Sequence, residues 1–254
     1  MNILVVNDDG IHARGIHALV KALSEAADIY VAAPNVQRSA AGHGITAHEK
    51  IYIEEAVFPY AKEAVSLTGT PVDCTKIGQA FYRAKGIRMD MVFSGINHGG
   101  NLGTDTLYSG TVSAAIEGNI CGLPAVAVSV NSHDAVHFDY ACALAVRTAR
   151  KAYKKLGAHS TLSINVPNVP YDEVKGVVYA PLGTREYDKW FQACGEENGK
   201  QVYMYKGAPK SPEPVADDDV TDVAYISRGY ATITALKHDF TDWKLTEELK
   251  EWGI

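Results

Sequence analysis

The sequence predicts an α/β fold, with a Rossmann-like, mostly parallel sheet flanked by helices and a C-terminal β-hairpin extension. Short runs rich in Val, Ile and Ala recur along the chain and end at Gly, Pro or polar residues. Segments with helical spacing of apolar residues separate these runs. An aromatic segment follows the alternating part of the chain. We expect a single domain over residues 1–254, with a core of about 1–183 plus 221–236 and a hairpin of about 184–208.

The first elements are a strand, a helix and a second strand. Ile3-Leu4-Val5-Val6 is typical of a buried parallel strand. A helix is predicted over about 13–26, where apolar residues repeat with helical spacing. A strand is expected over Asp28 to Ala33 and to stop at Pro34, because proline lacks an amide donor and restricts the residue before it. Further strands are expected at 89–93, 125–130, 162–166 and 231–236, and a further helix at 140–156.

Residues 184–208 differ from the rest of the chain in their aromatic content. Tyr and Trp residues precede Asn198-Gly199 and further Tyr residues follow it, which predicts two strands joined by a tight turn. A hairpin of this length has little core of its own, and exposed aromatic area usually marks an interface. We therefore expect this arm to contact another subunit, with folding back onto its own sheet as the alternative.

Composition excludes several classes of function. The net charge of −6 provides no basic face for a nucleic acid. The longest apolar runs fall short of a membrane span, and the N-terminus has no signal-peptide pattern, so we expect a cytoplasmic protein without a membrane partner. The four cysteines are widely spaced, which argues against a zinc site and a disulfide framework.

Two adjacent carboxylates, Asp8 and Asp9, come directly after the first strand and before Gly10. Open α/β sheets bind their ligands at the carboxyl ends of parallel strands. Neighbouring carboxylates repel each other, and a hard divalent cation removes this conflict. The pair therefore predicts a site for Mg²⁺, Mn²⁺ or Ca²⁺; the alternative is a solvated acidic turn.

Three further loops are expected at the same edge of the sheet. One contains Ser39, and a glycine-rich segment from Ser94 to Gly103 contains Asn97. The third is Ser109-Gly110-Thr111, which opens a predicted helix. Because a helix N-terminus offers unpaired amides and a partial positive charge, it suits a phosphate group. A plain N-cap is the alternative for Ser109.

These motifs together resemble those of the survival protein E (SurE) family. The resemblance extends from Asn2 to about Thr234, and five motifs carry it in order: Asn7-Asp8-Asp9-Gly10, Ala33-Pro34-Asn35 with Arg38-Ser39, Gly69-Thr70-Pro71, Ser94-Gly95-Ile96-Asn97 with Gly99 and Asn101, and Tyr108-Ser109-Gly110-Thr111-Val112. The family consists of metal-dependent 5′/3′-nucleotidases, also described as acid phosphatases. The resemblance implies one divalent cation per subunit, most simply Mg²⁺ or Mn²⁺, a nucleoside monophosphate as substrate, and a homo-oligomer, either a dimer or a tetramer.

The resemblance also implies roles for individual residues. Asp8, Asp9, Ser39 and Asn97 would bind the metal, and Asn97, Ser109, Gly110 and Thr111 would contact the phosphate. The chain departs from the family where Gly44 replaces a frequent Ser and where Ser113 replaces a usual Gly. Both departures bear on substrate preference and not on the class of reaction.

Several alternatives remain open at the level of sequence. His43 and His98 are candidates either for acid–base groups or for structural hydrogen bonds. Asp8 and Asp9 are the catalytic candidates, but either can orient the attacking water, and a covalent aspartyl-phosphate is a further route. A signalling receiver is disfavoured because no Asp ends the 89–93 strand, and a dinucleotide-binding module lacks its glycine motif. A non-catalytic nucleotide-binding protein is the remaining rival of a nucleotidase.

Overall fold

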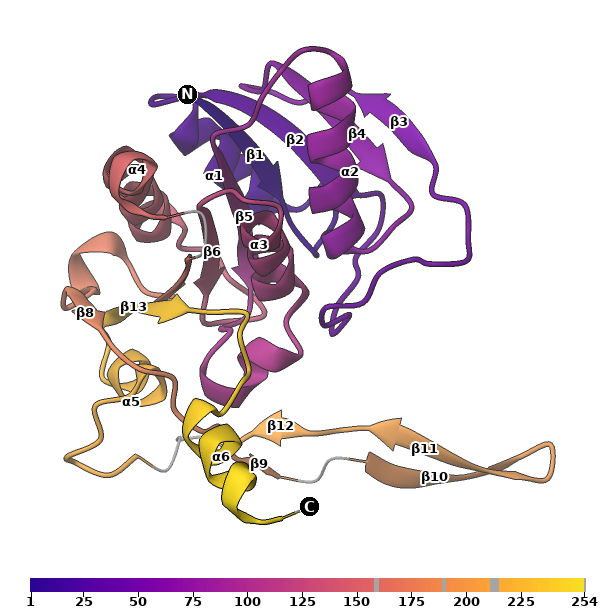
Figure 1. The fold of residues 1–254 in the computed structure, drawn as a ribbon, viewed down its shortest axis with the longest axis vertical. Coiled ribbons are helices and arrows are strands. Elements are labelled where there is room, and N and C mark those ends of the chain that lie inside the picture. The colour runs from indigo at the N-terminus through magenta and orange to yellow at the C-terminus, as the bar shows by residue number, and fades with distance from the viewer. Residues whose placement is uncertain (158–159, 189–190, 211–214, 254) are drawn as a thin grey trace.

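The computed structural model describes residues 1–157, 160–188, 191–210 and 215–253. Within these residues, nine strands form one sheet, which Figure 1 shows at the centre of the molecule. Its strand order is β3 (Ile53–Ala56), β4 (Glu63–Leu67), β2 (Asp28–Pro34), β1 (Asn2–Val6), β5 (Met91–His98), β6 (Ala125–Val130), β7 (Thr161–Val166), β13 (Ala231–Leu236) and β8 (Val177–Tyr179). Neighbours are parallel except at the β3–β4 and β7–β13 pairs. The α/β class with a mostly parallel sheet is therefore confirmed.

Four helices cover the two faces of this sheet. They are α1 (Arg14–Leu23), α2 (Pro71–Ala84), α3 (Gly110–Ile120) and α4 (Asp139–Lys155). Side chains of β1 alternate between the faces: Ile3 and Val5 join the core under α1 and α4, and Leu4 and Val6 join the core under α2 and α3. Because the central strands run parallel, their carboxyl ends meet at one edge, where the N-termini of α2 and α3 also lie (Figure 1).

Most of the predicted elements are present, with shifted ends. The strand at 89–93 is the main correction: it begins later and, as β5, continues through Asn97 to His98, so the expected glycine-rich loop starts only at Gly99. Glycine permits this course, because Gly95 has φ +134° and a Cβ there would lie 2.2 Å from the carbonyl oxygen of Val128. The strand containing Asp28 includes Pro34, and α1 ends at Leu23.

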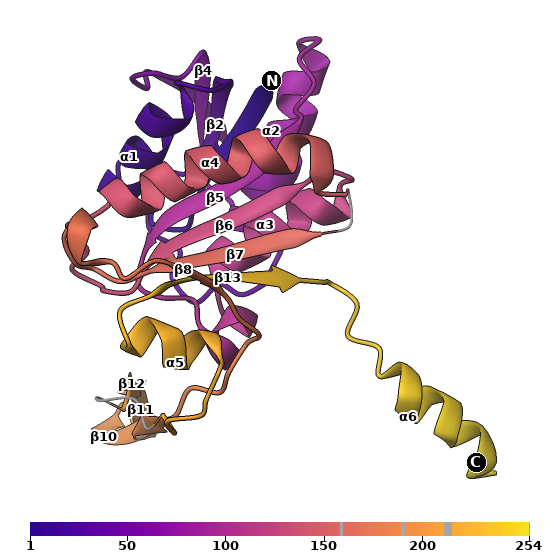
Figure 2. The same cartoon turned by 90° about the vertical axis from the view of Figure 1, so that its left-hand side faces the viewer.

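The segment between Ile53 and Ala84 holds two strands and a helix that the sequence pattern did not predict. The helix, α2, has a clear start signal. Thr70 and Asp73 form a reciprocal capping box, and Pro71 occupies the first turn. The short α5 (Asp222–Ser227) and α6 (Trp243–Glu248) were also not predicted. Figure 2 shows α6 projecting away from the sheet and its covering helices.

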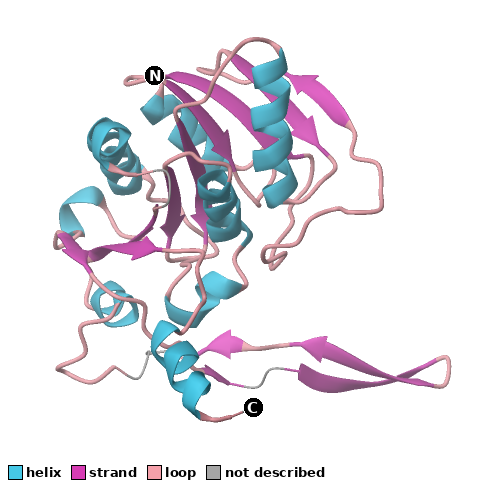
Figure 3. Cartoon of the chain, viewed as in Figure 1, coloured by secondary structure: helices cyan, strands magenta, loops and turns pink. Residues whose placement is uncertain are grey.

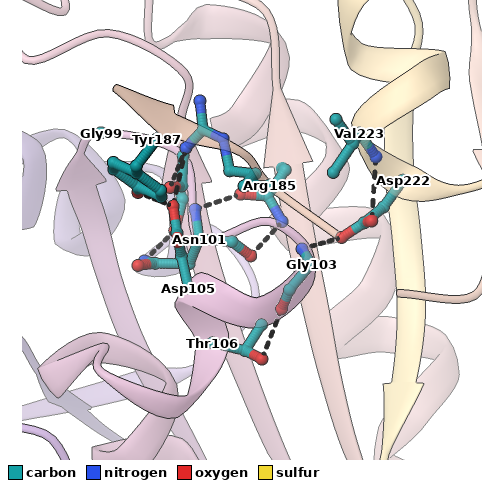
Figure 4. A network of polar contacts seen from close by, with 12 residues as sticks. Gly99, Asn101, Gly103, Asp105, Thr106, Arg185, Tyr187, Asp222 and Val223 are labelled. Carbon is teal, nitrogen blue, oxygen red and sulfur yellow. Dashed lines mark hydrogen bonds and ion pairs between the residues drawn. The ribbon is translucent and has the colours of Figure 1, made fainter. Parts of the chain in front are cut away.

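The predicted hairpin is present as β10 (Phe191–Glu197) and β11 (Lys200–Tyr205), joined at Asn198-Gly199. Figure 3 shows it extending away from the body. Its base is fixed by β9 (Tyr187–Asp188), which pairs with β12 (Ala208–Pro209), and by Asp105, which accepts hydrogen bonds from Tyr187 and from Arg185 at 2.9 Å (Figure 4). The loop at 209–219 falls partly outside the described residues. In the described part of the chain, every helix is too short or too polar to cross a membrane.

Candidate active site

The site is built at the carboxyl ends of two neighbouring strands. Asp8 and Asp9 follow β1, and Asn97 is the penultimate residue of β5. These strands pair in register, with Val6 opposite Ser94, so the two ends meet side by side. The N-terminus of α3 lies against the same edge. The structure thus brings together Asp8, Asp9, Asn97 and the start of α3, as the sequence predicts.

Asp8 is buried and is held by α3. Its side chain accepts a 2.6 Å hydrogen bond at Oδ1 from the Thr111 hydroxyl, and the residue is only 6% exposed. Burial is the largest influence and raises the pKa of Asp8; the Thr111 bond opposes this and the Asp9 charge adds to it, which places the pKa at about 6. A Cβ at Gly110 would lie 3.0 Å from the Asp8 side chain, so glycine permits the helix to approach this closely without a shift of the carboxylate.

Asp9 is oriented toward β5 instead. Its Oδ2 accepts a hydrogen bond from the backbone amide of His98 at 3.1 Å, and its Oδ1 accepts one from Gln37 Nε2 at 3.2 Å. Asn97 donates from Nδ2 to the carbonyl of Gly99 at 2.8 Å, which leaves its Oδ1 as an acceptor for a ligand. Asp8 and Asp9 are thus oriented by contacts from other elements, and Asn97 by a contact within its own strand end.

The Ser39 loop, residues 35–46, is joined to this edge through its backbone. The amide of Arg38 donates to the carbonyl of Asp8 at 2.7 Å, and Arg38 Nη2 donates to the carbonyl of Thr68 at 2.8 Å. Ser39 itself is exposed and makes no hydrogen bond to Asp8, Asp9 or Asn97 within the described residues. The structure therefore brings the loop to the site and leaves the Ser39 side chain at its surface.

The first turn of α3 has a side-chain cap and backbone amides that have no partner within the helix. Ser109 is the N-cap, and its Oγ accepts a hydrogen bond from the amide of Val112 at 3.0 Å. The N-cap alternative for Ser109 is therefore correct, but it does not exclude a contact with phosphate, because the first amides of a helix lack partners within the helix. Gly110 supplies such an amide beside Asp8, and the amide of Thr111 is directed at the Asp8 carboxylate.

The two histidines have different surroundings. His43 Nε2 lies 2.9 Å from Oε2 of Glu117, a buried residue of α3. The ring of His98 stacks on Phe138 at 5.4 Å, and its Nε2 is buried without a hydrogen-bond partner among the described residues. Glu117 and its second partner, Lys76, were not singled out in the sequence, because a Glu and a Lys 41 positions apart have no distinguishing spacing and the helix that carries Lys76 was not predicted.

The chemistry of the donor set fits a hard divalent cation. In the described part of the chain, neither Asp8 nor Asp9 forms an ion pair with Lys, Arg or His within 4.0 Å. Two adjacent carboxylates, an amide oxygen and a nearby hydroxyl are oxygen donors of the kind that Mg²⁺ and Mn²⁺ prefer. The described residues contain no cluster of three or more His, Cys, Asp or Glu.

Comparison with known proteins decides the family. The model of the family described as "Survival protein SurE" matches residues 3–189, which include the strand ends and helix start described above. The chain belongs to the SurE family.

Among SurE relatives, a protein from Syntrophomonas wolfei named "5′-nucleotidase SurE" is 40% identical over 99% of this chain and 94% of its own length. A protein of the same name from Petrotoga mobilis is 39% identical, with 99% of each chain covered. The crystal structure of the SurE protein from Aquifex aeolicus is 31% identical, covers 100% of both chains and superimposes with a TM-score of 0.84. The fold of this chain is therefore that of a SurE structure.

Proposed function

We propose that this chain is a 5′-nucleotidase, a phosphomonoesterase that depends on a divalent metal and hydrolyses nucleoside 5′- or 3′-monophosphates to nucleoside and phosphate. The relatives named above carry the activity in their names. The observation that carries the proposal for this chain is the buried carboxylate of Asp8, beside Asp9 and hydrogen-bonded to the first turn of α3. An anionic pair beside a helix N-terminus suits a cation and a phosphate bound next to each other.

The chain's own residues divide into two sets. Asp8, Asp9, Ser39 and Asn97 would hold the cation, with Mg²⁺ or Mn²⁺ as the preferred ions. Asn97, Ser109, Gly110 and Thr111 would hold the phosphate, mainly through the amides at the start of α3. A bound divalent cation neutralises charge on the phosphoryl group and lowers the pKa of bound water. The helix amides add stabilisation of the same charge without rearrangement.

Asp8 and Asp9 would be the catalytic side chains. Both are fixed before substrate arrives, Asp8 by Thr111 and Asp9 by the amide of His98. A carboxylate fixed in this way orients the attacking water and accepts its proton when the geometry is right. The imidazole of His43 is engaged by Glu117, so we assign it no proton transfer.

We also propose that the protein acts as a homo-oligomer, a dimer or a tetramer, in the cytoplasm. The hairpin exposes large apolar side chains along its length, with Phe191, Tyr203 and Met204 each more than half exposed. An arm with so little core of its own gains most from burial against another subunit. Closed symmetry would bury the arms of all subunits equally.

The test of the proposed activity is phosphate release from 5′-AMP and 3′-AMP with Mn²⁺ or Mg²⁺ present. We expect turnover with both metals, and the two rates show whether the 5′- or the 3′-phosphate is preferred. p-Nitrophenyl phosphate serves as a substrate without a nucleoside. Binding of 5′-AMP by calorimetry with no release of phosphate under any metal would support the rival, a non-catalytic nucleotide-binding protein.

A further inference from the structure

Glu117 is a buried carboxylate that joins three parts of the chain. Its side chain is 4% exposed. Oε1 lies 2.6 Å from Lys76 Nζ of α2, and Oε2 lies 2.9 Å from Nε2 of His43 in the Ser39 loop. Burial raises its pKa, but the hydrogen bonds from Lys76 and His43 outweigh this and hold the pKa below the usual value. The carboxylate is therefore ionised, with Cys121 as its remaining polar neighbour at 3.6 Å.

The position of Glu117 on α3 links this cluster to the site. The same helix contacts Asp8 through Thr111 in its first turn and contacts His43 through Glu117 two turns later. A helix is rigid over this distance. The carboxylate of Asp8 and the loop that carries Ser39 are thus both held by contacts with α3.

The backbone of the Ser39 loop contains a strained residue, which contacts with the rest of the chain must hold in place. Ala40, directly after Ser39, has φ +55°, a left-handed conformation that costs energy for a residue with a Cβ. The loop is also held by the amide of Gly42, which donates to Tyr108 at 3.1 Å, and by Thr70, whose hydroxyl donates to the carbonyl of Gly44 at 2.8 Å. Strained loops persist where surrounding contacts over-determine them.

We propose that His43 is a positioning residue: by binding Glu117, it holds the Ser39 loop over the start of α3, so that Ser39 is presented to the cation held by Asp8 and Asp9. The inference rests on the proposed metal site. It assigns His43 no role in proton transfer. Lys76 holds the Glu117 carboxylate in place, and Glu117 in turn binds His43.

The test compares His43→Ala with His43→Gln, and uses His48→Ala, an exposed histidine beyond the Ser39 loop, as the control. A glutamine amide occupies the place of imidazole Nε2 and still donates to Glu117, but carries no titrating proton. We expect His43→Ala to weaken Mn²⁺ binding, measured by calorimetry, about 10- to 100-fold, as losses of outer-shell partners do. Hydrogen exchange at 39–46 should accelerate, with exchange in β6 unchanged.

The same experiment with His43→Gln should restore Mn²⁺ affinity and slow exchange, and the pH profile of phosphate release should keep the wild-type shape. A lost limb of that profile in His43→Gln, with Mn²⁺ affinity intact, would make His43 an acid–base catalyst and overturn the proposal. Wild-type exchange and Mn²⁺ affinity in His43→Ala would also overturn it. Failure of the proposed function is separate, because it appears as absent Mn²⁺ binding in the unaltered protein.

Discussion

Asp8 shows how a residue with a proposed role in metal binding can oppose the stability of its own fold. Folding raises the pKa of Asp8 from 3.8 to about 6, first through burial. The folded state therefore binds more protons than the unfolded state between these two values, and stability falls as pH rises through that window. At one pKa unit per ~1.4 kcal/mol, the ionised carboxylate costs the metal-free protein about 3 kcal/mol above pH 6.

Replacing Asp8 by Asn tests this cost, because the amide keeps the acceptor for Thr111 and removes the charge. In protein dialysed against chelator, Asp8→Asn should melt about 6–12 °C above wild type at pH 8 and show no advantage below pH 4. Scanning calorimetry over this range measures the difference, and Asp134→Asn, at an exposed carboxylate, is the control. A melting temperature below wild type at pH 8 would contradict the burial argument.

At the residue level the sequence predicted which strand ends lie side by side, but not how their side chains are held. Asp8, Asp9 and Asn97 were predictable because parallel strands end at one edge. The contact of His43 with Glu117 was not predictable, because it joins a loop to the last turn of a helix, and the two residues are 74 positions apart. The left-handed Ala40 gives no sequence signal either, since alanine rarely adopts that conformation.

Among the elements, α3 contacts the candidate site through Thr111, and its first turn approaches Asp8 at a glycine. Gly110→Ala places a Cβ 3.0 Å from Asp8 and so pushes the first turn of α3 away from the carboxylate. We expect the fold to survive and phosphate release to fall about 10²–10³-fold, because the amides no longer face the reacting group. Gly157→Ala, which meets open space, is the control. Wild-type turnover in Gly110→Ala would remove α3 from the phosphate site.

Elements with strong periodicity were predictable, and edge elements were not. β1, β6 and β7 are buried runs bounded by breakers, and their bounds agree closely with the pattern. β3 is an exposed edge strand of Ile-Glu-Glu-Ala, which carries no strand pattern. Strand β5 was cut short in the prediction because Gly95 indicates a turn by sequence, whereas the structure uses it for close approach to β6.

At the scale of the whole molecule, contacts within one chain do not explain why the hairpin exposes its aromatic side chains. The base of the hairpin belongs to the body through Arg185 and Tyr187, but β10 and β11 expose their aromatic side chains. Its sequence predicted the hairpin through Asn198-Gly199, but no pattern within one chain specifies the surface that covers it.

Deleting 191–205 and closing the gap with a Gly-Ser linker removes the arm and keeps its base. We expect light scattering to report a smaller assembly than that of the full chain, because the apolar area for contact is lost. Circular dichroism and melting temperature check that the body still folds. An unchanged mass, or a full chain that is already monomeric at micromolar concentration, would contradict the role of the hairpin in assembly.

The central claim is that Asp8 and Asp9 form, with a divalent cation, the centre that hydrolyses nucleoside monophosphates. The most direct measurement is phosphate release from 5′-AMP by chelator-dialysed protein, with and without added Mn²⁺, for wild type and Asp9→Asn side by side. We predict no release without metal, recovery on adding Mn²⁺ to wild type, and a rate about 10²–10³-fold lower in Asp9→Asn, as for the loss of one fixed electrostatic contact. Full activity after dialysis, or equal recovery in Asp9→Asn, would contradict the account.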